Sequence, residues 1–442
     1  MATCESGPMF LKGINCDGEY KDKHCIANFL IDAIKEIGYQ NVVQVITDNA
    51  PVCRAAGLLV EARYPNIFWT PCVVHTLNLA LKSICSPKPN DDWYDKCSWI
   101  SEIAADVGFI KIFIVNHNMR LTMYKDHCKL KLLFITETRF ASTLVMIRRF
   151  KEVKEGLEQM VISPNWSLYK EDDVSKARRV KEQILDEYFW DEIDYILSFI
   201  ASIYEMIRTA DTDKPSLHLV YEWWDTMIEK VKAAIYRKEH KQLHEESDFF
   251  DVDPSRVAPH QDAEITRERK KCLEKYFSDD RARRDINVEY ASFSMCLDDF
   301  GAIDAINDRF HMEPMVWWIV HGSSTPNLQS IALKLLGQPC SSSCCERNWS
   351  TYSFIHSLRR NKLTPQRAED LVFMHSNLRL LSRKSPSYKE GVTKMWDIGG
   401  DGFDNLGEEG VGMLEIANLS LDEPSLEVAL FTGEDITNIV VD

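Results

Sequence analysis

Apolar residues near the start of the chain follow first a helical and then an extended period. From residue 26 onward they recur at i, i+3, i+4 and i+7, which predicts a helix over 22–37 that Gly38 stops. The β-branched run at 42–47 predicts a buried strand, and the MFLKGI segment at 9–14 predicts a shorter one before the helix. Strand, helix and strand in this order predict a βαβ unit with a parallel sheet.

The α/β pattern continues to residue 84. We predict a helix over 50–62, a short strand at 67–69 and a second helix that Pro71 opens. The inner face of this second helix is expected to comprise Val73, Leu77, Ala80, Leu81 and Ile84. Residues 86–92 are predicted to form a loop.

Beyond this region the pattern predicts a mainly helical protein. Residues 99–125 favour helix, and 139–235 repeat their apolar positions with strong amphipathic character. The polar, proline-broken stretch 240–264 predicts a loop or a disordered segment. Residues 268–300 return to a helical pattern.

The end of the chain differs in both period and charge. Thr364 and Pro365 predict the cap and the first turn of a last helix. From 385 to 442 the chain holds 13 acidic residues and two Lys, which is −11 of its formal charge of −16. We expect residues 384–442 to form an acidic, disordered tail, and the negative charge argues against a chain that grips DNA by itself.

Bulk composition narrows the class of protein. A chain of 442 residues with 45% hydrophobic content predicts a globular protein with two or three structural units. The 13 Cys are odd in number and lack tight regular spacing, which indicates reduced intracellular thiols instead of a disulfide framework. We expect neither a membrane span nor a secretory signal, because the sequence shows no long apolar run and no basic start.

Candidate chemistry occurs at three places. Asp48 follows the strand at 42–47, where a carboxylate can hold Mg²⁺, although Asp-Asn after a strand is also ordinary turn chemistry. Cys72 and His75 form CVVH, but no second ligand pair lies nearby, so a buried Cys and a hydrogen-bonded His are favoured over zinc. Glu346 stands at a predicted helix start, where a lone Glu usually complements the helix dipole.

Taken in order, these segments resemble the hAT superfamily of DNA transposases. VVQVITDNA resembles the segment of the family's second catalytic Asp, and WTPCVVHTLNL resembles its Cys-x-x-His helix. TRFAST, which holds Arg139, resembles the entry to the family's helical insertion. WWIVHGSSTPNLQSIALKLLGQPCSSSCCERNWSTYSFIHS resembles its carboxy-terminal dimerisation region. The resemblance covers residues 9–383 and is closest to domesticated or decayed plant hAT-like proteins.

The resemblance implies an α/β fold in which a large all-α insertion interrupts a ribonuclease H-like core. The implied domains are a partial core at 1–143, the insertion at 144–310, a helical dimerisation region that completes the core at 311–383, and the tail at 384–442. The residues that we expect to form the dimerisation surface are Trp317, Trp318, Trp349, Tyr352, Phe354, Ile355, Leu371, Phe373 and Leu378.

The family's catalytic centre is an Asp-Asp-Glu triad that holds two metal ions for phosphoryl transfer. Asp48 matches the second Asp and Glu346 the Glu, with Cys72, His75 and Arg139 structurally near. The first Asp is expected on a strand before the MFLKGI segment, and this chain begins after that point. The family's amino-terminal zinc finger is likewise not found in the sequence.

The resemblance therefore implies a catalytically inactive, transposase-derived protein with no cofactor, in which Asp48 and Glu346 are vestigial. It would act in the nucleus as a homodimer, or as a heterodimer with related hAT proteins, with DNA as a further partner and no membrane. One alternative is a residual DNA transposase or nuclease that uses Mg²⁺. The other is a DNA-binding module whose phosphate contacts come from Arg359, Arg360, Lys362 and Arg367.

Overall fold

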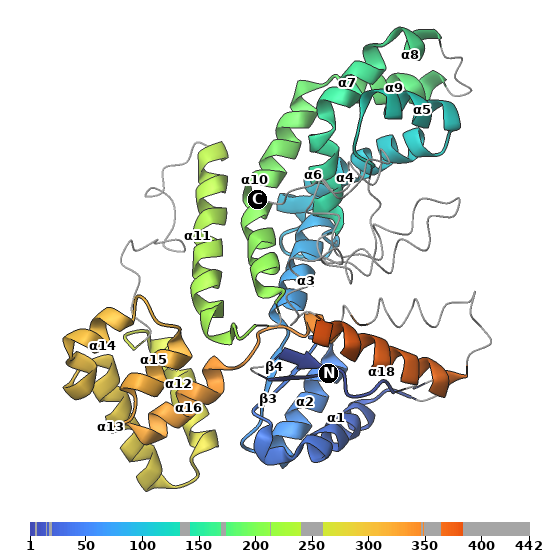
Figure 1. Cartoon of the computed structure of the whole chain (residues 1–442). Helices are drawn as coiled ribbons and strands as arrows, with labels where there is room; N and C mark the ends of the chain where they lie inside the picture. The colour runs from blue at the N-terminus through green and yellow to red at the C-terminus, as the bar shows by residue number, and fades with distance from the viewer. Residues whose placement is uncertain are drawn as a thin grey trace. The chain divides into compact units, whose positions relative to one another are not determined.

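The computed structural model describes residues 1–4, 7–14, 16, 20–132, 142–168, 174–212, 214–239, 260–345, 348 and 364–382. These residues are mostly helical and divide into two compact units (Figure 1). Unit 1 comprises 1–76, 208–226 and 242–376, and unit 2 comprises 77–207, 227–241 and 377–442. The chain passes between the units within α3 (Val73–Cys85), α10 (Glu187–Ala210), α11 (Val220–Glu239) and α18 (Pro365–Ser382).

The α/β part of unit 1 is a parallel strand pair packed against two helices (Figure 1). Its elements are α1 (Lys23–Ile37), η1 (Tyr39–Asn41), β3 (Gln44–Thr47), α2 (Pro51–Arg63) and β4 (Phe68–Pro71). Strand β3 pairs in parallel with β4, as the predicted βαβ unit requires. Ile34, Val45, Val60 and Ile67 form the buried core between the helices and the strands.

Local sequence signals fix the ends of α1 as expected. The Asp22 side chain caps the helix by accepting a hydrogen bond from the Cys25 N–H at 2.8 Å. Gly38 ends the helix with a φ of 92°, a conformation that favours glycine. The predicted helix at 22–37 is therefore confirmed, as are the predicted strand at 42–47 and the predicted helix at 50–62.

A predicted strand, a predicted helix start and one predicted inner-face residue are wrong. Residues 10–14 form no strand: β2 (Gly7–Met9) pairs with β1 (Ala2–Cys4), and Phe10 is buried instead, with its ring 6.2 Å from that of Phe373. Pro71 ends β4 instead of opening α3, because the Cys72 N–H donates to the Thr47 carbonyl and continues the ladder by one residue. On α3, Ala80 is exposed, whereas Leu77 and Leu81 are buried as predicted.

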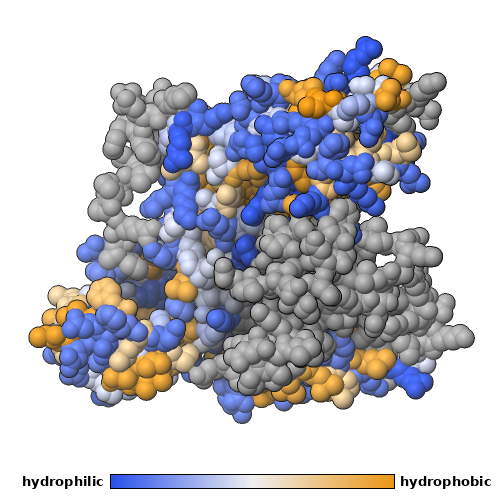
Figure 2. Space-filling view, turned by 45° about the horizontal axis from the view of Figure 1, so that its top comes forward, coloured by the Kyte–Doolittle hydropathy of each residue, from blue (hydrophilic) through white to orange (hydrophobic). Residues whose placement is uncertain are grey.

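The second part of unit 1 is a bundle of short helices. Its elements are α12 (Ala263–Tyr276), α13 (Asp280–Ser294), η3 (Asp298–Gly301), α14 (Ile303–Asp308), α15 (Pro314–His321) and α16 (Pro326–Leu336), and η2 (Leu217–Leu219) contacts α16. Phe300, Ala305, Trp317 and Trp318 form its buried core. Figure 2 shows apolar surface gathered over this bundle, at lower left. The segment 268–300, predicted to be helical, contains two helices, because α12 ends at Tyr276 and α13 begins at Asp280.

Unit 2 is helical. Its elements are α4 (Tyr94–Val115), α5 (Asn118–His127), α6 (Ser142–Glu152), α7 (Lys154–Ile162), α8 (Pro164–Leu168) and α9 (Val174–Ile184), together with most of α3, α10 and α11. The rings of Phe150 and Trp190 stack at 5.3 Å in its core, and the Trp190 indole N–H donates to the Ile184 carbonyl. Helices at these positions confirm the helical character predicted for 99–125 and, within the described residues, for 139–235.

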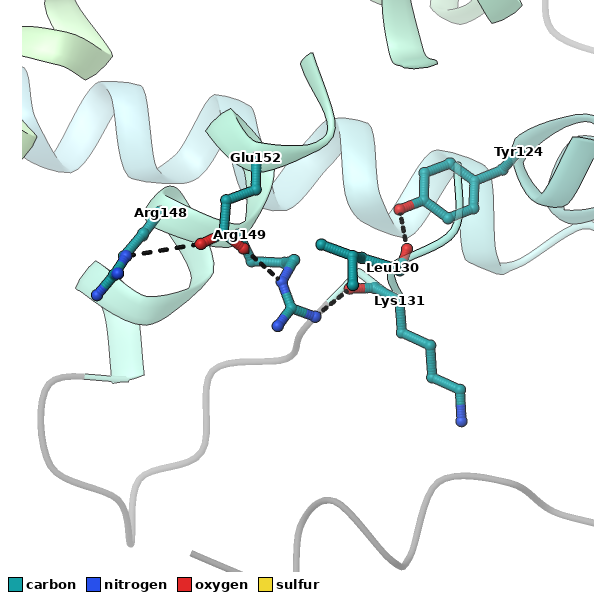
Figure 3. A network of polar contacts seen from close by, with 6 residues as sticks. All are labelled: Tyr124, Leu130, Lys131, Arg148, Arg149 and Glu152. Carbon is teal, nitrogen blue, oxygen red and sulfur yellow. Dashed lines mark hydrogen bonds and ion pairs between the residues drawn. The ribbon is translucent and has the colours of Figure 1, made fainter. Parts of the chain in front are cut away.

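A buried arginine ties α6 to the chain that follows α5 (Figure 3). Arg149 is 2% exposed; its Nε lies 2.9 Å from Glu152 Oε2, and one of its terminal amines donates to the Lys131 carbonyl. Tyr124 donates its hydroxyl proton to the neighbouring Leu130 carbonyl. Because both bonds end on main-chain carbonyls, they fix the backbone at residues 130–131 rather than a side chain.

Some predictions fall outside the described residues. These are residues 240–259 of the loop predicted at 240–264, most of the segment from 346 to 363, and the acidic tail at 384–442. The last two residues of the predicted loop, 263 and 264, begin α12 instead. Among the helices that are described, none combines the length and apolar character that a membrane crossing needs.

Candidate functional site

The carboxyl ends of β3 and β4 place Asp48 and Cys72 at the same edge of the strand pair. Asp48 follows Thr47, and Cys72 follows Pro71, which pairs directly with Thr47. Functional groups of open α/β folds collect at this edge of a parallel sheet. The two positions singled out from sequence are therefore neighbours in the fold.

The Asp48 carboxylate is engaged in local structure. Its Oδ1 accepts a hydrogen bond from the Ala50 N–H at 3.2 Å, which is an Asx turn leading into α2. Burial, a hydrogen bond to Asp48 and the negative charge of Asp48 raise the pKa of the Cys53 thiol to about 12. The thiol therefore stays protonated at neutral pH and donates to the carboxylate.

Thr47 links this turn to the neighbouring strand. The Trp69 indole N–H donates to the Thr47 hydroxyl oxygen at 2.9 Å, and the same hydroxyl donates to the Asp48 carbonyl at 2.8 Å. Gly57 of α2 lies directly against the Trp69 ring, since a Cβ there would come within 2.1 Å of Trp69 Cδ1. The position of Asp48 thus depends on how closely α2 packs on β4.

Cys72 joins the sheet edge to a segment 270 residues later in the chain. Its sulfur is fully buried, lies 3.5 Å from the Ser341 hydroxyl and accepts from the Ser342 N–H at 3.4 Å. The same sulfur accepts from the His75 N–H at 3.5 Å, as an N-cap would at the start of α3. His75 itself is half-buried on α3. Cys72 therefore acts as a structural acceptor between two distant parts of unit 1.

A second cysteine extends this polar cluster. The Cys340 carbonyl accepts from the Val73 N–H at 3.0 Å, and the Cys340 sulfur accepts from the Ser216 hydroxyl at 3.2 Å. Burial raises the pKa of the Cys340 thiol, and the hydrogen bond from Ser216 offsets part of that rise. Ser341 and Ser343 are also buried and bond to each other. The cluster fixes residues 340–343 against the carboxyl end of β4.

The predicted dimerisation residues divide into buried and exposed groups. Trp317 and Trp318 are 4% and 8% exposed and belong to the core of the α12–α16 bundle. Leu371, Phe373 and Leu378 of α18 are exposed. Thr364 and Pro365 open α18 as predicted, and the Arg367 N–H donates to the Thr364 hydroxyl at 3.4 Å.

The remaining predicted site residues lie outside the described part of the chain. They are Arg139, Glu346, Trp349, Tyr352, Phe354 and Ile355, and the basic residues Arg359, Arg360 and Lys362. Within the described residues, no three His, Cys, Asp or Glu side chains gather as metal ligands would. Of the two residues matched to the expected triad, Asp48 lies in the described part of the chain and Glu346 lies outside it.

Sequence reasoning missed the polar cluster around Cys72. Ser216 lies in no motif; Cys340, Ser341 and Ser343 lie in the segment that resembles the dimerisation region, but small polar residues are ordinary loop formers and were given no role there. The available signal was composition, because QPCSSSCC places three Cys and three Ser in a short segment that the structure largely buries.

The fold and the site together define an α/β protein. The edge of its strand pair is hydrogen-bonded to a late segment of the chain, and a bundle of helices forms a second part of the same unit. Two family models match the chain. A domain of unknown function, DUF659, matches residues 1–110, and the hAT family C-terminal dimerisation region matches residues 273–378. No protein of curated function gives a significant match. Residues 273–378 are therefore similar to the dimerisation region of hAT-family transposases, and this match supports association of the chain with itself or with a related protein.

Proposed function

We propose that this protein is a catalytically inactive, hAT-derived protein that works in the nucleus by pairing with a second copy of itself. The single observation that carries the proposal is the match of residues 273–378 to the hAT dimerisation region. In the fold this range begins within α12 and includes the whole of α13–α16. That bundle has its own aromatic core and carries exposed apolar side chains, as interaction modules do.

A ribonuclease H-like core is part of the same proposal. The parallel β3–β4 pair with α1 and α2, and the bonds from Cys72 to Ser341 and Ser342, support a core that early and late segments build together. Such a core is interrupted in sequence, as the hAT resemblance implies.

Catalytic inactivity is supported by the surroundings of Asp48. Its carboxylate accepts from the Ala50 N–H and from the protonated Cys53 thiol, which are turn and packing contacts. These two contacts hold the carboxylate against its own turn and α2 and leave only part of its roughly four acceptor positions for a cation. We therefore assign Asp48 a structural role at the start of α2.

Mass measurement in solution tests the pairing. The full chain is applied to size-exclusion chromatography with light scattering over a hundredfold range of concentration, and a dimer is expected. A wild-type chain that stays a monomer at every concentration would remove the basis of the proposal.

A cleavage assay and imaging test the other two parts. The full chain with Mg²⁺ or Mn²⁺ is expected to leave labelled DNA intact; cleavage that Asp48→Ala abolishes would establish the residual enzyme instead. A fluorescent fusion of the full chain is expected in the nucleus, and its exclusion from the nucleus would contradict that assignment.

A further inference from the structure

Two neighbouring helices of the α12–α16 bundle turn apolar side chains outward. On α14 and the turn after it, Ile303, Ile306 and Phe310 are 77%, 39% and 82% exposed and recur at i, i+3 and i+7. On α15, Val316, Ile319 and Val320 recur at i, i+3 and i+4 and are 47%, 58% and 53% exposed. Helices α14 and α15 contact each other. We call these six residues the α14–α15 face.

The bundle core holds both helices in a fixed orientation. Trp317 is buried between them and donates its indole N–H to the Ala305 carbonyl at 2.9 Å. His321 Nε2 lies 2.9 Å from Asp308 Oδ2, which gives a second link from α15 to α14. The outward side chains therefore lose little backbone freedom when a partner covers them, and a preorganised surface binds more tightly.

The charge pattern favours a second copy of the chain over a nucleic acid. The six residues are all aliphatic or aromatic, so the face offers no cation to a phosphate. Asp304, Arg309 and Glu313 are exposed, stand beside these positions in the sequence and supply both signs of charge. An apolar centre with a mixed rim suits a self-complementary contact, because a twofold axis brings each rim charge opposite the partner's rim.

The size of the face also suits a dimer. A typical monomer exposes its largest apolar patch at roughly 300–600 Å², whereas a standard interface buries roughly 800 Å² on each partner. Six large side chains, four of them more than half exposed, together with a polar rim approach the area that such an interface needs.

The structure describes the residues next to the α14–α15 face in the sequence more completely than those next to α18. Leu371, Phe373 and Met374 are exposed on α18 too, but residues 349–363 and 383–442 adjoin this helix and lie outside the described part of the chain. The α14–α15 face lies within the continuous described range 260–345 and within the matched dimerisation region. We propose that a second copy of this chain docks on the α14–α15 face, an inference that rests on the proposed function.

The test compares four full-length proteins by sedimentation equilibrium. They are the wild type, Phe310→Asp with Ile319→Asp, Leu371→Asp with Phe373→Asp, and the control Leu168→Asp. Leu168 is 79% exposed on α8 and outside the matched region, so it matches Phe310 in exposure. The first double variant is expected to weaken the dimer at least ~100-fold, because each contact occurs in both copies. The control is expected to keep the wild-type dissociation constant.

Each outcome decides a separate point. A wild-type dimer that survives the Phe310 and Ile319 changes overturns the face and leaves the proposed function standing, and loss of the dimer only in the α18 variant does the same. A monomeric wild type overturns both proposals. Circular dichroism checks folding; if the Asp variant loses helix, Phe310→Gln with Ile319→Thr replaces it, and an unchanged dimer in that folded variant again overturns the face.

Discussion

Gly57→Ala sets two known effects of opposite sign against each other. Alanine is favoured over glycine inside a helix by about 1 kcal/mol. The new methyl group would lie within 2.3 Å of Trp69 Cγ and 2.6 Å of Trp69 Nε1, which is closer than any real contact. A small movement of the far end of the Trp69 ring cannot relieve the clash, because Cγ is the ring atom bonded to Cβ.

The clash is expected to win. Overpacking of this kind costs about 1–3 kcal/mol, and displacing Trp69 also breaks its bond to Thr47, worth about 1 kcal/mol. After the helix-propensity gain, unit 1 should lose about 1–3 kcal/mol of unfolding free energy. Because Thr47 contacts Asp48, the loosened packing should extend to the sheet edge.

Urea unfolding followed by circular dichroism measures the change, and hydrogen exchange locates it. The Phe68 and Cys72 amides donate to the Val43 and Thr47 carbonyls, so they should lose protection. Gly108→Ala is the matched control: Gly108 lies inside α4 with nothing within 4 Å of a new Cβ, so it should gain up to about 1 kcal/mol. A Gly57→Ala protein at least as stable as the wild type would refute the packing argument.

Three further changes test other contacts. Glu152→Ala leaves Arg149 buried without its carboxylate and should cost about 2–3 kcal/mol in thermal unfolding, whereas Arg148→Ala, which removes an exposed pair with the same Glu152, should cost less than about 0.5 kcal/mol; equal losses would contradict this. Cys72→Ala removes the acceptor of the Ser342 N–H and should cost about 1–2 kcal/mol, with faster exchange at residues 340–345; unchanged exchange there would count against the cluster. Backbone N–H bonds, first from Ile265, lower the pKa of Asp262 below 3.8, so its capping of α12 is fully present above that pH and is lost as pH falls through the lowered pKa. Asp262→Asn should therefore flatten the acid limb of the stability profile, and an unaltered limb would show that the cap does not contribute.

Local signals carried the sequence predictions that succeeded. The Asp22 cap, the helical repeat of α1 and the stop at Gly38 lie within 17 consecutive residues, and each acts through its own neighbours. The MFLKGI strand failed because Phe10 buries its ring in tertiary packing instead of extending a sheet. Pro71 failed for a related reason, since both a strand end and a helix start accept proline.

Long-range contacts set the limit of the sequence reading. Two adjacent Trp residues suit a core or an interface equally well, and the burial of Trp317 and Trp318 becomes visible only when α14 and α16 are placed around them. The partners of Cys72 lie 269 and 270 residues away, with no periodicity to connect them. By contrast, the outward apolar spacing at 303–310 was present in the sequence and needed only the fold to show which side it faced.

The separation between Cys72 and Ser342 has a consequence for synthesis on the ribosome. At a synthesis rate of about 5–20 residues per second, roughly 15–50 s pass between the emergence of Cys72 and that of Ser342, whose N–H donates to the Cys72 sulfur. During that interval the nascent sheet edge waits incomplete, which makes it a natural client for chaperones. Slower translation between codons 72 and 342 should lengthen the time for which the sheet edge is incomplete and lower the yield of folded protein.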